Sequence, residues 1–284
     1  AGPAEIRLAV EAAAAAWKKW SVMPWEERAA VSLKAAEIVS RRKRSLINAS
    51  TMLCQSKTCH QSEIDAICEL SDFLRMNTWF MQQIYQIQPE NFAATWNRME
   101  YRALEGFVFA VTPFNFTAIG GNLSMAPALT GNTVLWKPSS TAVYSNWMVM
   151  QAFMEAGLPP GVINFIPGDS SAIGKLVLSD PALAGVHFTG STAAFNSMWQ
   201  VIGGDIGRYR TYPRIVGETG GKDFLVAHAS AEPQGLATCL VRGAFEYQGQ
   251  KCSATSRAYI PSSIWPDVRD RMLGMLSQIK VGPV

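Results

Sequence analysis

Short runs of apolar, β-branched and aromatic residues alternate with stretches of helical periodicity after Asn91. This alternation indicates a parallel sheet covered on both faces, because each connection between parallel strands places a helix against the sheet. We therefore predict an α/β fold with a Rossmann-type parallel sheet. The expected strands are Tyr101–Leu104, Gly106–Thr112, Thr133–Trp136, Val162–Ile166, Gly185–Phe188, Arg214–Val216 and Phe224–Ala227. The expected helices between them are Ile119–Leu129, Ala142–Ala156, Ser171–Leu178 and Thr192–Ile202.

The first ninety residues predict helices instead. Apolar residues recur at helical spacing along a first helix that contains Trp17 and Trp20. A second helix is expected to begin near Pro24, because proline is tolerated in a first turn. A third helix is predicted from about Ser62 to Ile87, and we expect its apolar side chains in the core: Ile64, Ile67, Leu74 and Trp79.

A domain boundary is expected at Glu218-Thr219-Gly220-Gly221, where two glycines interrupt the pattern before a new strand and helix. We predict a first domain at residues 1–217, which includes the helical amino-terminal part. Residues 218–284 are expected to begin a second α/β domain.

Composition excludes several classes of function. A net charge of +3 is too small to indicate binding to nucleic acid or an anionic membrane. No apolar stretch reaches the roughly 20 residues that a membrane span requires. The basic run Arg41-Arg42-Lys43-Arg44 follows a helical pattern and is interpreted as a solvated helix end. The five cysteines form no CxxC pair and no metal-ligand pattern, which favours free thiols and predicts no metal site.

Half of a dinucleotide-binding motif is present. Gly190-Ser191-Thr192 follows an expected strand and opens an expected helix, where backbone N–H groups can bind a pyrophosphate. Phe195 stands in the place of the last glycine of GxGxxG. The motif alone therefore fits an ordinary tight turn as well as a cofactor site.

Cys252 and Glu218 are the candidates for covalent and acid–base chemistry. Cys252 lies among glycine and polar residues, which fits either a reactive thiolate or an inert thiol. Glu218 follows an expected strand beside flexible glycines, which suits a general base or a surface carboxylate paired with Lys222. The three histidines form no Cys–His protease arrangement: His187 is expected inside a strand, and His60 and His228 at element ends.

Five segments together resemble the aldehyde dehydrogenase superfamily, in its order and spacing. They are Thr112-Pro113-Phe114-Asn115-Phe116, Leu135-Trp136-Lys137-Pro138-Ser139, Phe188-Thr189-Gly190-Ser191-Thr192, Gly217-Glu218-Thr219-Gly220-Gly221-Lys222 and Gly249-Gln250-Lys251-Cys252. Within the superfamily, residues 113–123, 126–139 and 244–254 resemble the branch that oxidises 1-pyrroline-5-carboxylate, and that branch also has a bulky residue at the position of Phe195.

The resemblance implies a role for each matching residue. Cys252 would attack an aldehyde, Asn115 would donate to the oxyanion, and Glu218 would activate water. The resemblance also implies that residues 1–217 form the NAD-binding domain and that residues 218–284 begin the catalytic domain. The residues implied to bind NAD are Thr112, Lys137, Gly190, Ser191, Thr192, Ala193 and Ala194.

The implied reaction is oxidation of L-glutamate γ-semialdehyde to L-glutamate, the second step of proline degradation. Two alternatives stay open: a dehydrogenase for another semialdehyde, or a non-catalytic nucleotide-binding fragment. Retention of Cys252, Asn115 and Glu218 favours an active parent protein. Many NAD-selective relatives carry a glutamate where Ser140 stands, so charge at this position does not select against NADP.

The remaining expectations concern the parent protein. Family members continue well beyond Val284, so we expect a chain truncated at its carboxyl end, and the absence of an initial methionine suggests removal at the amino end. The full-length protein is expected to be a homodimer or a higher homo-oligomer. Its small-molecule partner is an aldehyde. By resemblance, the compartment is the mitochondrial matrix in a eukaryote and the cytoplasm otherwise.

Overall fold

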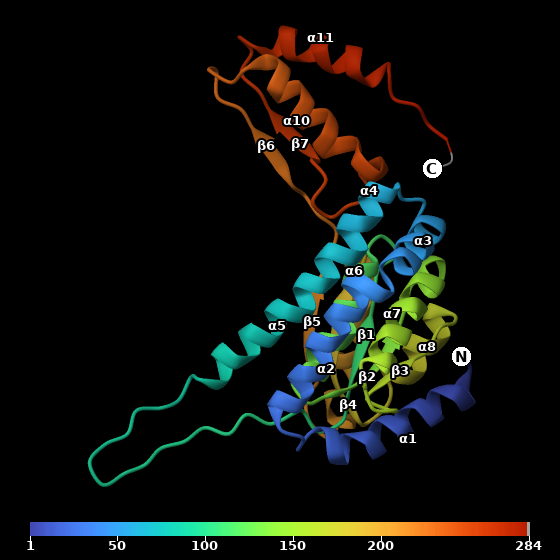
Figure 1. Cartoon of the computed structure of the whole chain (residues 1–284), viewed down its shortest axis with the longest axis vertical. Helices are drawn as coiled ribbons and strands as arrows, with labels where there is room; N and C mark the ends of the chain where they lie inside the picture. The colour runs from blue at the N-terminus through green and yellow to red at the C-terminus, as the bar shows by residue number, and fades with distance from the viewer. Residues whose placement is uncertain (283–284) are drawn as a thin grey trace. The chain divides into compact units, whose positions relative to one another are not determined.

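The computed structural model describes residues 1–282, which form two compact units. The first unit comprises residues 1–218 and the second begins at Thr219 (Figure 1).

The first unit contains a five-stranded, all-parallel sheet in the order β3-β2-β1-β4-β5. Register places Phe109 of the central strand beside Leu135 on one side and Val186 on the other. The strands are β1 (Phe107–Val111), β2 (Thr133–Lys137), β3 (Ile163–Phe165), β4 (Leu183–Thr189) and β5 (Arg214–Glu218). The parallel sheet predicted from the apolar runs is confirmed.

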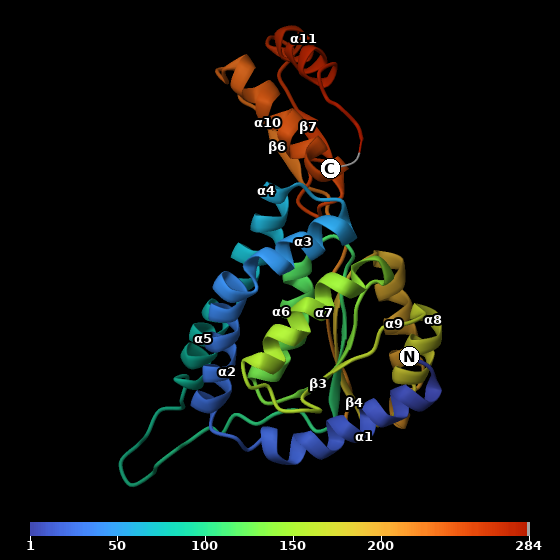
Figure 2. The same cartoon turned by 45° about the vertical axis from the view of Figure 1, so that its right-hand side comes forward.

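Helices cover both faces of this sheet (Figure 2). Alternate residues of a strand point to opposite faces, so Val108 and Ala110 enter one core cluster while Phe107 and Phe109 enter the other. The helices that follow the strands are α6 (Thr117–Leu129), α7 (Val143–Glu155), α8 (Ser170–Val177) and α9 (Thr192–Gly204), each within two residues of its predicted bounds. Side chains of α6, α7 and residues 20–74 enter the first cluster, and side chains of α8, α9 and residues 6–13 enter the second.

The amino-terminal segment is helical, as predicted. Its elements are α1 (Pro3–Trp20), α2 (Trp25–Glu37), the π-helix η1 (Ile38–Arg42), α3 (Arg44–Gln55), α4 (Cys59–Ser62), the π-helix η2 (Glu63–Cys68) and α5 (Glu69–Tyr85). Pro24 is the N-cap of α2, which confirms the predicted start. Ile67 and Leu74 are buried, but Ile64 is 43% exposed and Trp79 is 50% exposed, so the prediction that both lie in the core was wrong.

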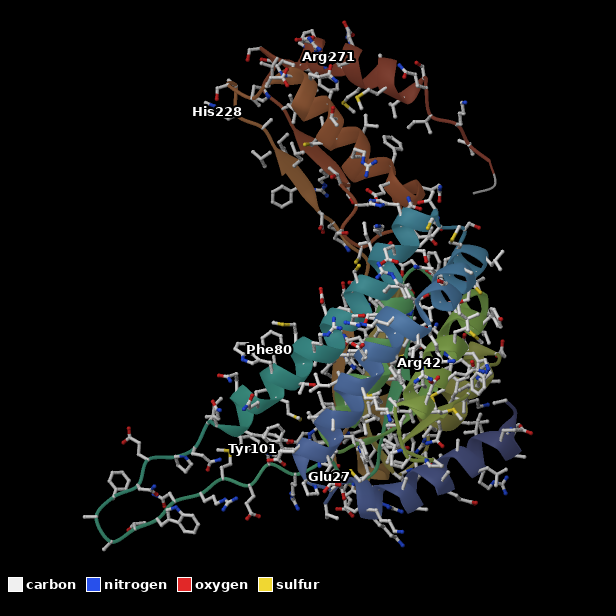
Figure 3. The ribbon with its side chains drawn as sticks, viewed as in Figure 1. Glu27, Arg42, Phe80, Tyr101, His228 and Arg271 are labelled. Carbon is white, nitrogen blue, oxygen red and sulfur yellow. The ribbon has the colours of Figure 1, made fainter. Side chains whose placement is uncertain are left out.

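The predicted strand at Tyr101–Leu104 was also wrong. Residues 86–106 connect α5 to β1 and contain no named strand. Tyr101, labelled in Figure 3, instead stacks on Tyr85 with ring centroids 5.1 Å apart, and its hydroxyl donates to the Ile87 carbonyl. The Leu104 N–H donates to the side chain of Asn132, so an asparagine oxygen replaces the ladder partner that a strand would require.

The second unit packs two helices against a two-stranded parallel sheet. Its elements are β6 (Phe224–Val226), α10 (Pro233–Phe245), the 3₁₀ turn η5 (Glu246–Gly249), β7 (Arg257–Tyr259) and α11 (Trp265–Leu276). Its core is small and centres on Leu236, Ala237, Leu240 and Val268. On the surface, Arg271 of α11, labelled in Figure 3, donates to the side-chain oxygen of Gln234 of α10 at 2.8 Å.

Across residues 1–282, no helix is both long and apolar enough to cross a membrane.

Candidate active site

The predicted cofactor residues lie where strands of the first sheet end. All five strands run parallel, so their carboxyl ends share one edge. Thr112, Lys137, Gly190 and Glu218 stand at the ends of β1, β2, β4 and β5. In sheets of this topology, ligands bind at this edge where the strand order reverses, which here is between β1 and β4.

Thr112 and Lys137 are linked through neighbouring strands. The Thr112 N–H donates to the Lys137 carbonyl at 3.1 Å, and the Trp136 indole donates to the Thr112 hydroxyl at 3.0 Å. The Lys137 side chain is buried and its Nζ donates to Ser170 Oγ at 2.5 Å. Burial lowers the pKa of Lys137, while the nearby Asp169 carboxylate partly opposes that shift. The ammonium group is therefore positioned by a hydroxyl at the start of α8.

The turn after β4 begins helix α9. Ser191 is the N-cap, and its hydroxyl accepts the Ala194 N–H at 3.2 Å. Thr192, Ala193 and Ala194 are exposed, so only small side chains surround the first turn of the helix. The N–H groups of a first helical turn have no intrahelical acceptor and attract anions. This turn can therefore accept a pyrophosphate.

Phe195 replaces the missing glycine of the dinucleotide motif. Its ring stacks on Phe188 at 5.6 Å between centroids and meets Trp199 edge-on. A Cβ at Gly217 would collide with the Phe195 ring. A glycine in β5 thus provides the space that the aromatic side chain occupies, and α9 packs closely without the third glycine.

Asn115 lies in the loop between β1 and α6. The residue is half-buried, and its backbone carbonyl accepts a hydrogen bond from Lys57 Nζ. Lys57 also forms an ion pair with Asp65 at 2.7 Å. Sequence reasoning did not identify Lys57 or Asp65, because a lysine and an aspartate in a helical region carry no pattern that predicts their burial.

Glu218 is the last residue of β5 and is exposed. Its backbone carbonyl accepts the Gly190 N–H at 3.1 Å, which ties the end of β5 to the turn after β4. Its carboxylate is therefore carried on an ordered strand end and is accessible to solvent.

Cys252 belongs to the second unit and is half-buried. It follows a turn in which Tyr247, Gln248 and Gly249 all have positive φ. A Cβ at Gly221 would collide with the Cys252 carbonyl oxygen, so the chain can pass the cysteine only with glycine at this position. The neighbouring Lys251 forms an ion pair with Glu246, with 3.6 Å between Nζ and Oε1. The structure thus holds the cysteine between a strained turn and a glycine.

Other candidate chemistry is not supported by the described residues. His60 and His228 are exposed. His187 lies in β4, where burial lowers its pKa and a hydrogen bond with the Leu123 carbonyl opposes the shift. No group of three or more His, Cys, Asp or Glu residues within 1–282 could hold a metal ion.

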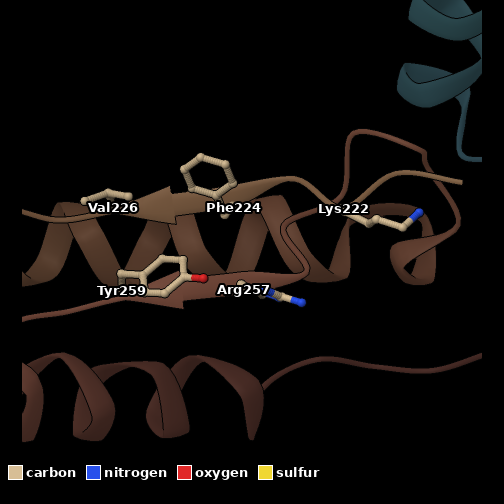
Figure 4. A pocket seen from close by; sticks show the side chains of 5 residues that line it. All are labelled: Lys222, Phe224, Val226, Arg257 and Tyr259. Atoms are coloured by element: carbon tan, nitrogen blue, oxygen red, sulfur yellow. The ribbon is translucent and has the colours of Figure 1, made fainter.

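A shallow hollow lies over β6 and β7 in the second unit (Figure 4). Its lining includes Lys222 of the fourth matching segment, but neither Cys252 nor any residue predicted to bind NAD. The other lining residues are Phe224, Val226, Arg257 and Tyr259.

The sequence is similar to known proteins along its whole length. The profile of the aldehyde dehydrogenase family matches residues 1–284. The mitochondrial Delta-1-pyrroline-5-carboxylate dehydrogenase of Dictyostelium discoideum is 52% identical over 98% of this chain and 50% of its own length. The human protein of the same name is 48% identical over 98% of this chain and 49% of its own length. The chain thus spans about half the length of the curated relatives that it matches.

Solved structures agree with the sequence comparison. The Mycobacterium tuberculosis Delta-pyrroline-5-carboxylate dehydrogenase bound with NAD has a TM-score of 0.97 and 55% identity, over 100% of this chain and 53% of that one. A Thermus 1-pyrroline-5-carboxylate dehydrogenase with bound NAD has a TM-score of 0.94 and 32% identity, over 100% of this chain and 55% of that one. On these sequence and structural matches, the chain belongs to the aldehyde dehydrogenase family.

Proposed function

We propose that this chain is the amino-terminal part of an NAD-dependent dehydrogenase that oxidises L-glutamate γ-semialdehyde to L-glutamate. The observation that carries the proposal is the strand edge of the first unit, where Lys137 and Glu218 end β2 and β5 and where Thr112 and Gly190 directly follow β1 and β4. Family membership and the names of the relatives supply the reaction and the substrate.

Residues at this edge fit a dinucleotide. The start of α9 combines an N-cap serine with exposed small side chains, as a pyrophosphate site requires. Lys137 would hydrogen-bond the adenosine ribose, and Thr112 would lie along the cofactor. Gly190, Ser191, Thr192, Ala193 and Ala194 would hold the pyrophosphate and the nicotinamide end. NAD, when bound, accepts the hydride that leaves the substrate.

Cys252 is assigned the nucleophilic step. Its thiolate would add to the aldehyde carbon, forming the C–S bond while the carbonyl oxygen takes up the negative charge. The side-chain amide of Asn115 and the backbone N–H of Cys252 would donate hydrogen bonds to that oxygen. Each such donor lowers the barrier by about 3–4 kcal/mol in well-characterised sites. After the hydride has left carbon, Cys252 holds the acyl group as a thioester.

Glu218 is assigned the hydrolytic step. Its exposed carboxylate at the end of β5 would take a proton from water, and the resulting hydroxide would attack the thioester carbon. The C–S bond then breaks, which releases the carboxylic acid and restores the Cys252 thiolate. Aldehyde, NAD and water thus give acid, NADH and a proton.

We also propose a domain division, an oligomeric state and a compartment for the parent protein. Residues 1–217 form the NAD-binding domain, and residues 218–284 form the first part of the catalytic domain. The full-length protein is a homodimer or a higher homo-oligomer, which sedimentation of that protein would test. Several eukaryotic relatives are named as mitochondrial. The mitochondrial matrix is the proposed compartment in a eukaryote and the cytoplasm otherwise, which fractionation of the source cells would test.

The test is NADH formation followed by absorbance with glutamate γ-semialdehyde as substrate. We compare this chain with a chimera in which the carboxyl-terminal half of the Mycobacterium tuberculosis relative continues it. The chimera should turn over, and Cys252→Ala should abolish that turnover while NAD binding is retained. Replacing NAD by NADP in the same assay measures the selectivity between the two cofactors, because Ser140 stands where many NAD-selective relatives carry a glutamate.

Three other outcomes would each contradict part of this proposal. Faster turnover of succinate semialdehyde would transfer the activity to another substrate of the same class. NAD binding without turnover of either aldehyde would contradict the catalytic proposal and support a nucleotide-binding scaffold. Turnover that survives Cys252→Ala would remove Cys252 from the mechanism.

A further inference from the structure

A lysine ammonium group is fully buried beside the loop that carries Asn115. Ser56 has a left-handed backbone that ends α3, and Lys57 follows it into the interior. The Lys57 side chain is 0% exposed and that of its partner Asp65, in η2, is 3% exposed. Such burial is rare for a charged pair and requires that the charges be well satisfied by neighbouring groups.

Lys57 makes two contacts with the Asn115 loop in addition to the ion pair. Its Nζ donates to the Asn115 backbone carbonyl, and it lies 4.3 Å from the centroid of the Phe116 ring. An ammonium group has three donor hydrogens and a compact charge. The Lys57 side chain therefore connects Asp65 of η2 to two successive residues of the loop, Asn115 and Phe116.

The same region of α3 also fixes the residue after the loop. Thr51 Oγ1 lies 2.8 Å from Thr117 Oγ1, and Gln55 Nε2 donates to that hydroxyl at 2.9 Å. Thr117 is the first residue of α6. The backbone on the carboxyl side of Asn115 is thus held by a buried polar cluster.

We propose that Lys57 and Asp65 are positioning residues that fix the backbone at Asn115, and through it the direction of the Asn115 side-chain amide. This inference rests on the proposed function, in which that amide donates to the oxyanion. Buried ion pairs contribute little net stability compared with apolar residues of similar size. The loop contacts therefore give the pair a role in orientation, and a donor displaced by about 1 Å can lower a rate by about 100-fold.

The variant that tests this role replaces both charges at once. Lys57→Met alone would leave the Asp65 carboxylate buried without its counter-charge, which endangers folding. Lys57→Met with Asp65→Leu keeps apolar volume and removes both charges together with the donor to Asn115. Arg44 and Glu63 also join α3 to η2, but the Arg44 side chain is 52% exposed. Arg44→Met is therefore the matched control.

The first measurement is single-turnover hydride transfer in the chimera, in two backgrounds. With Asn115 present, the Lys57/Asp65 double variant should slow the transfer by about 10- to 100-fold. With Asn115→Ala, which alone should cost about 100- to 1,000-fold, the same double variant should cost less than about threefold. Arg44→Met should stay within about twofold of the parent. Equal losses in both backgrounds, or no loss with Asn115 present, would overturn the positioning role.

The second measurement does not depend on activity. In the chain as it stands, the Lys57/Asp65 double variant should speed amide hydrogen exchange in residues 112–117 by about tenfold or more, with no change in β4. Unchanged exchange at residues 112–117 overturns the proposal even if the chimera is inactive. If exchange rises but Asn115→Ala leaves hydride transfer unchanged, Asn115 is not the oxyanion donor, and the proposed function fails at that residue.

Discussion

Gly221 lies directly against the backbone of the proposed nucleophile, Cys252. A Cβ at this position would collide with the Cys252 carbonyl oxygen, whereas a Cβ at Gly220 would meet nothing within 4 Å. We predict that Gly221→Ala displaces the cysteine segment and that Gly220→Ala does not. Overpacking of this kind costs about 1–3 kcal/mol of stability.

The measurement is the rate at which iodoacetamide alkylates Cys252, read by peptide mass spectrometry on the chain as it stands. Gly221→Ala should change that rate at least about fivefold, because a thiol's environment sets its reactivity. Gly220→Ala should leave the rate unchanged. Identical rates in both variants would show that the close approach at Gly221 does not constrain Cys252.

Lys137 is predicted to favour ligand binding at the expense of folding stability. Burial lowers its pKa in the folded protein, while the unfolded chain keeps the ordinary value. In the alkaline range the unfolded state therefore binds more protons, so the contribution of Lys137 to stability is least favourable at neutral pH and improves as pH rises.

Lys137→Met should accordingly unfold at a higher temperature than the parent at pH 7, and this difference should narrow toward pH 10. Loss of a charged hydrogen bond should weaken NAD binding by about 10-fold or more. Thermal unfolding across pH and an NAD titration measure the two effects, with the exposed Lys175→Met as control. A variant that is less stable at pH 7, or that binds NAD as the parent does, contradicts this account.

The sequence pattern predicted which strand or helix carries each site residue, but it could not predict which other side chains that residue contacts. Lys137 and Gly190 follow apolar runs, so a strand-end position was predictable from pattern alone. Lys57 was not predictable as buried, because its counter-charge Asp65 and its acceptor on Asn115 are brought to it only by packing of α3, η2 and the β1–α6 loop.

At the scale of elements, the packing of α9 against β5 depends on the fit of the Phe195 ring over Gly217. A Cβ at Gly217 would collide with the Phe195 ring. We predict that Gly217→Ala destabilises the first unit by about 1–3 kcal/mol. The same change in a Phe195→Ala background should cost less than about 0.5 kcal/mol, because the ring that blocks the methyl group is gone.

Urea unfolding followed by tryptophan fluorescence measures this coupling, since every tryptophan except Trp265 lies in the first unit. Gly203→Ala is the control, because a Cβ there would meet nothing within 4 Å. Additive losses for Gly217→Ala and Phe195→Ala would show that the ring does not fill the space over the glycine.

Burial shaped the sequence pattern of the central strands, which were predicted correctly. β1 is apolar on both faces because helices cover both, and β4 begins with four buried residues, so apolar runs marked the positions of both strands. The segment at Tyr101–Leu104 has a similar pattern, but its apolar and aromatic residues serve contacts with Tyr85 and Asn132 instead of a sheet. β7 is short and entirely exposed, so Arg257–Tyr259 carried no apolar run that could predict a strand.

At the scale of the whole molecule, the two units differ in the size of their sheets and of their hydrophobic cores. The first has a five-stranded sheet with a core cluster on each face and a third cluster around Ala29, Met81 and Leu129, whereas within residues 219–282 the second has a two-stranded sheet and a core cluster of four buried residues. Phe224, Val226 and Tyr259 are each more than half exposed. Two strands alone are only marginally stable, so the second unit depends more on its helices.

Because the two units have separate cores, NAD should slow amide hydrogen exchange only in the unit that binds it. If residues 1–217 are the NAD-binding domain, the cofactor stabilises the first unit by about 2.7 kcal/mol at 100 times its dissociation constant. Amide exchange in residues 112–117 and 190–195 should then slow by up to about 100-fold. Exchange in α10 and α11 should not change, because those helices pack on a separate core.

Hydrogen exchange with mass spectrometry on the chain as it stands, with and without NAD, measures both regions in one experiment. Lys137→Met provides the control, since weaker binding at the same NAD concentration should reduce the protection in residues 190–195. Equal protection of α10 would mean that the second unit also binds the cofactor, and the domain assignment would then be wrong. Protection confined to the first unit would show that this part of the chain binds NAD without the carboxyl-terminal half that its relatives possess.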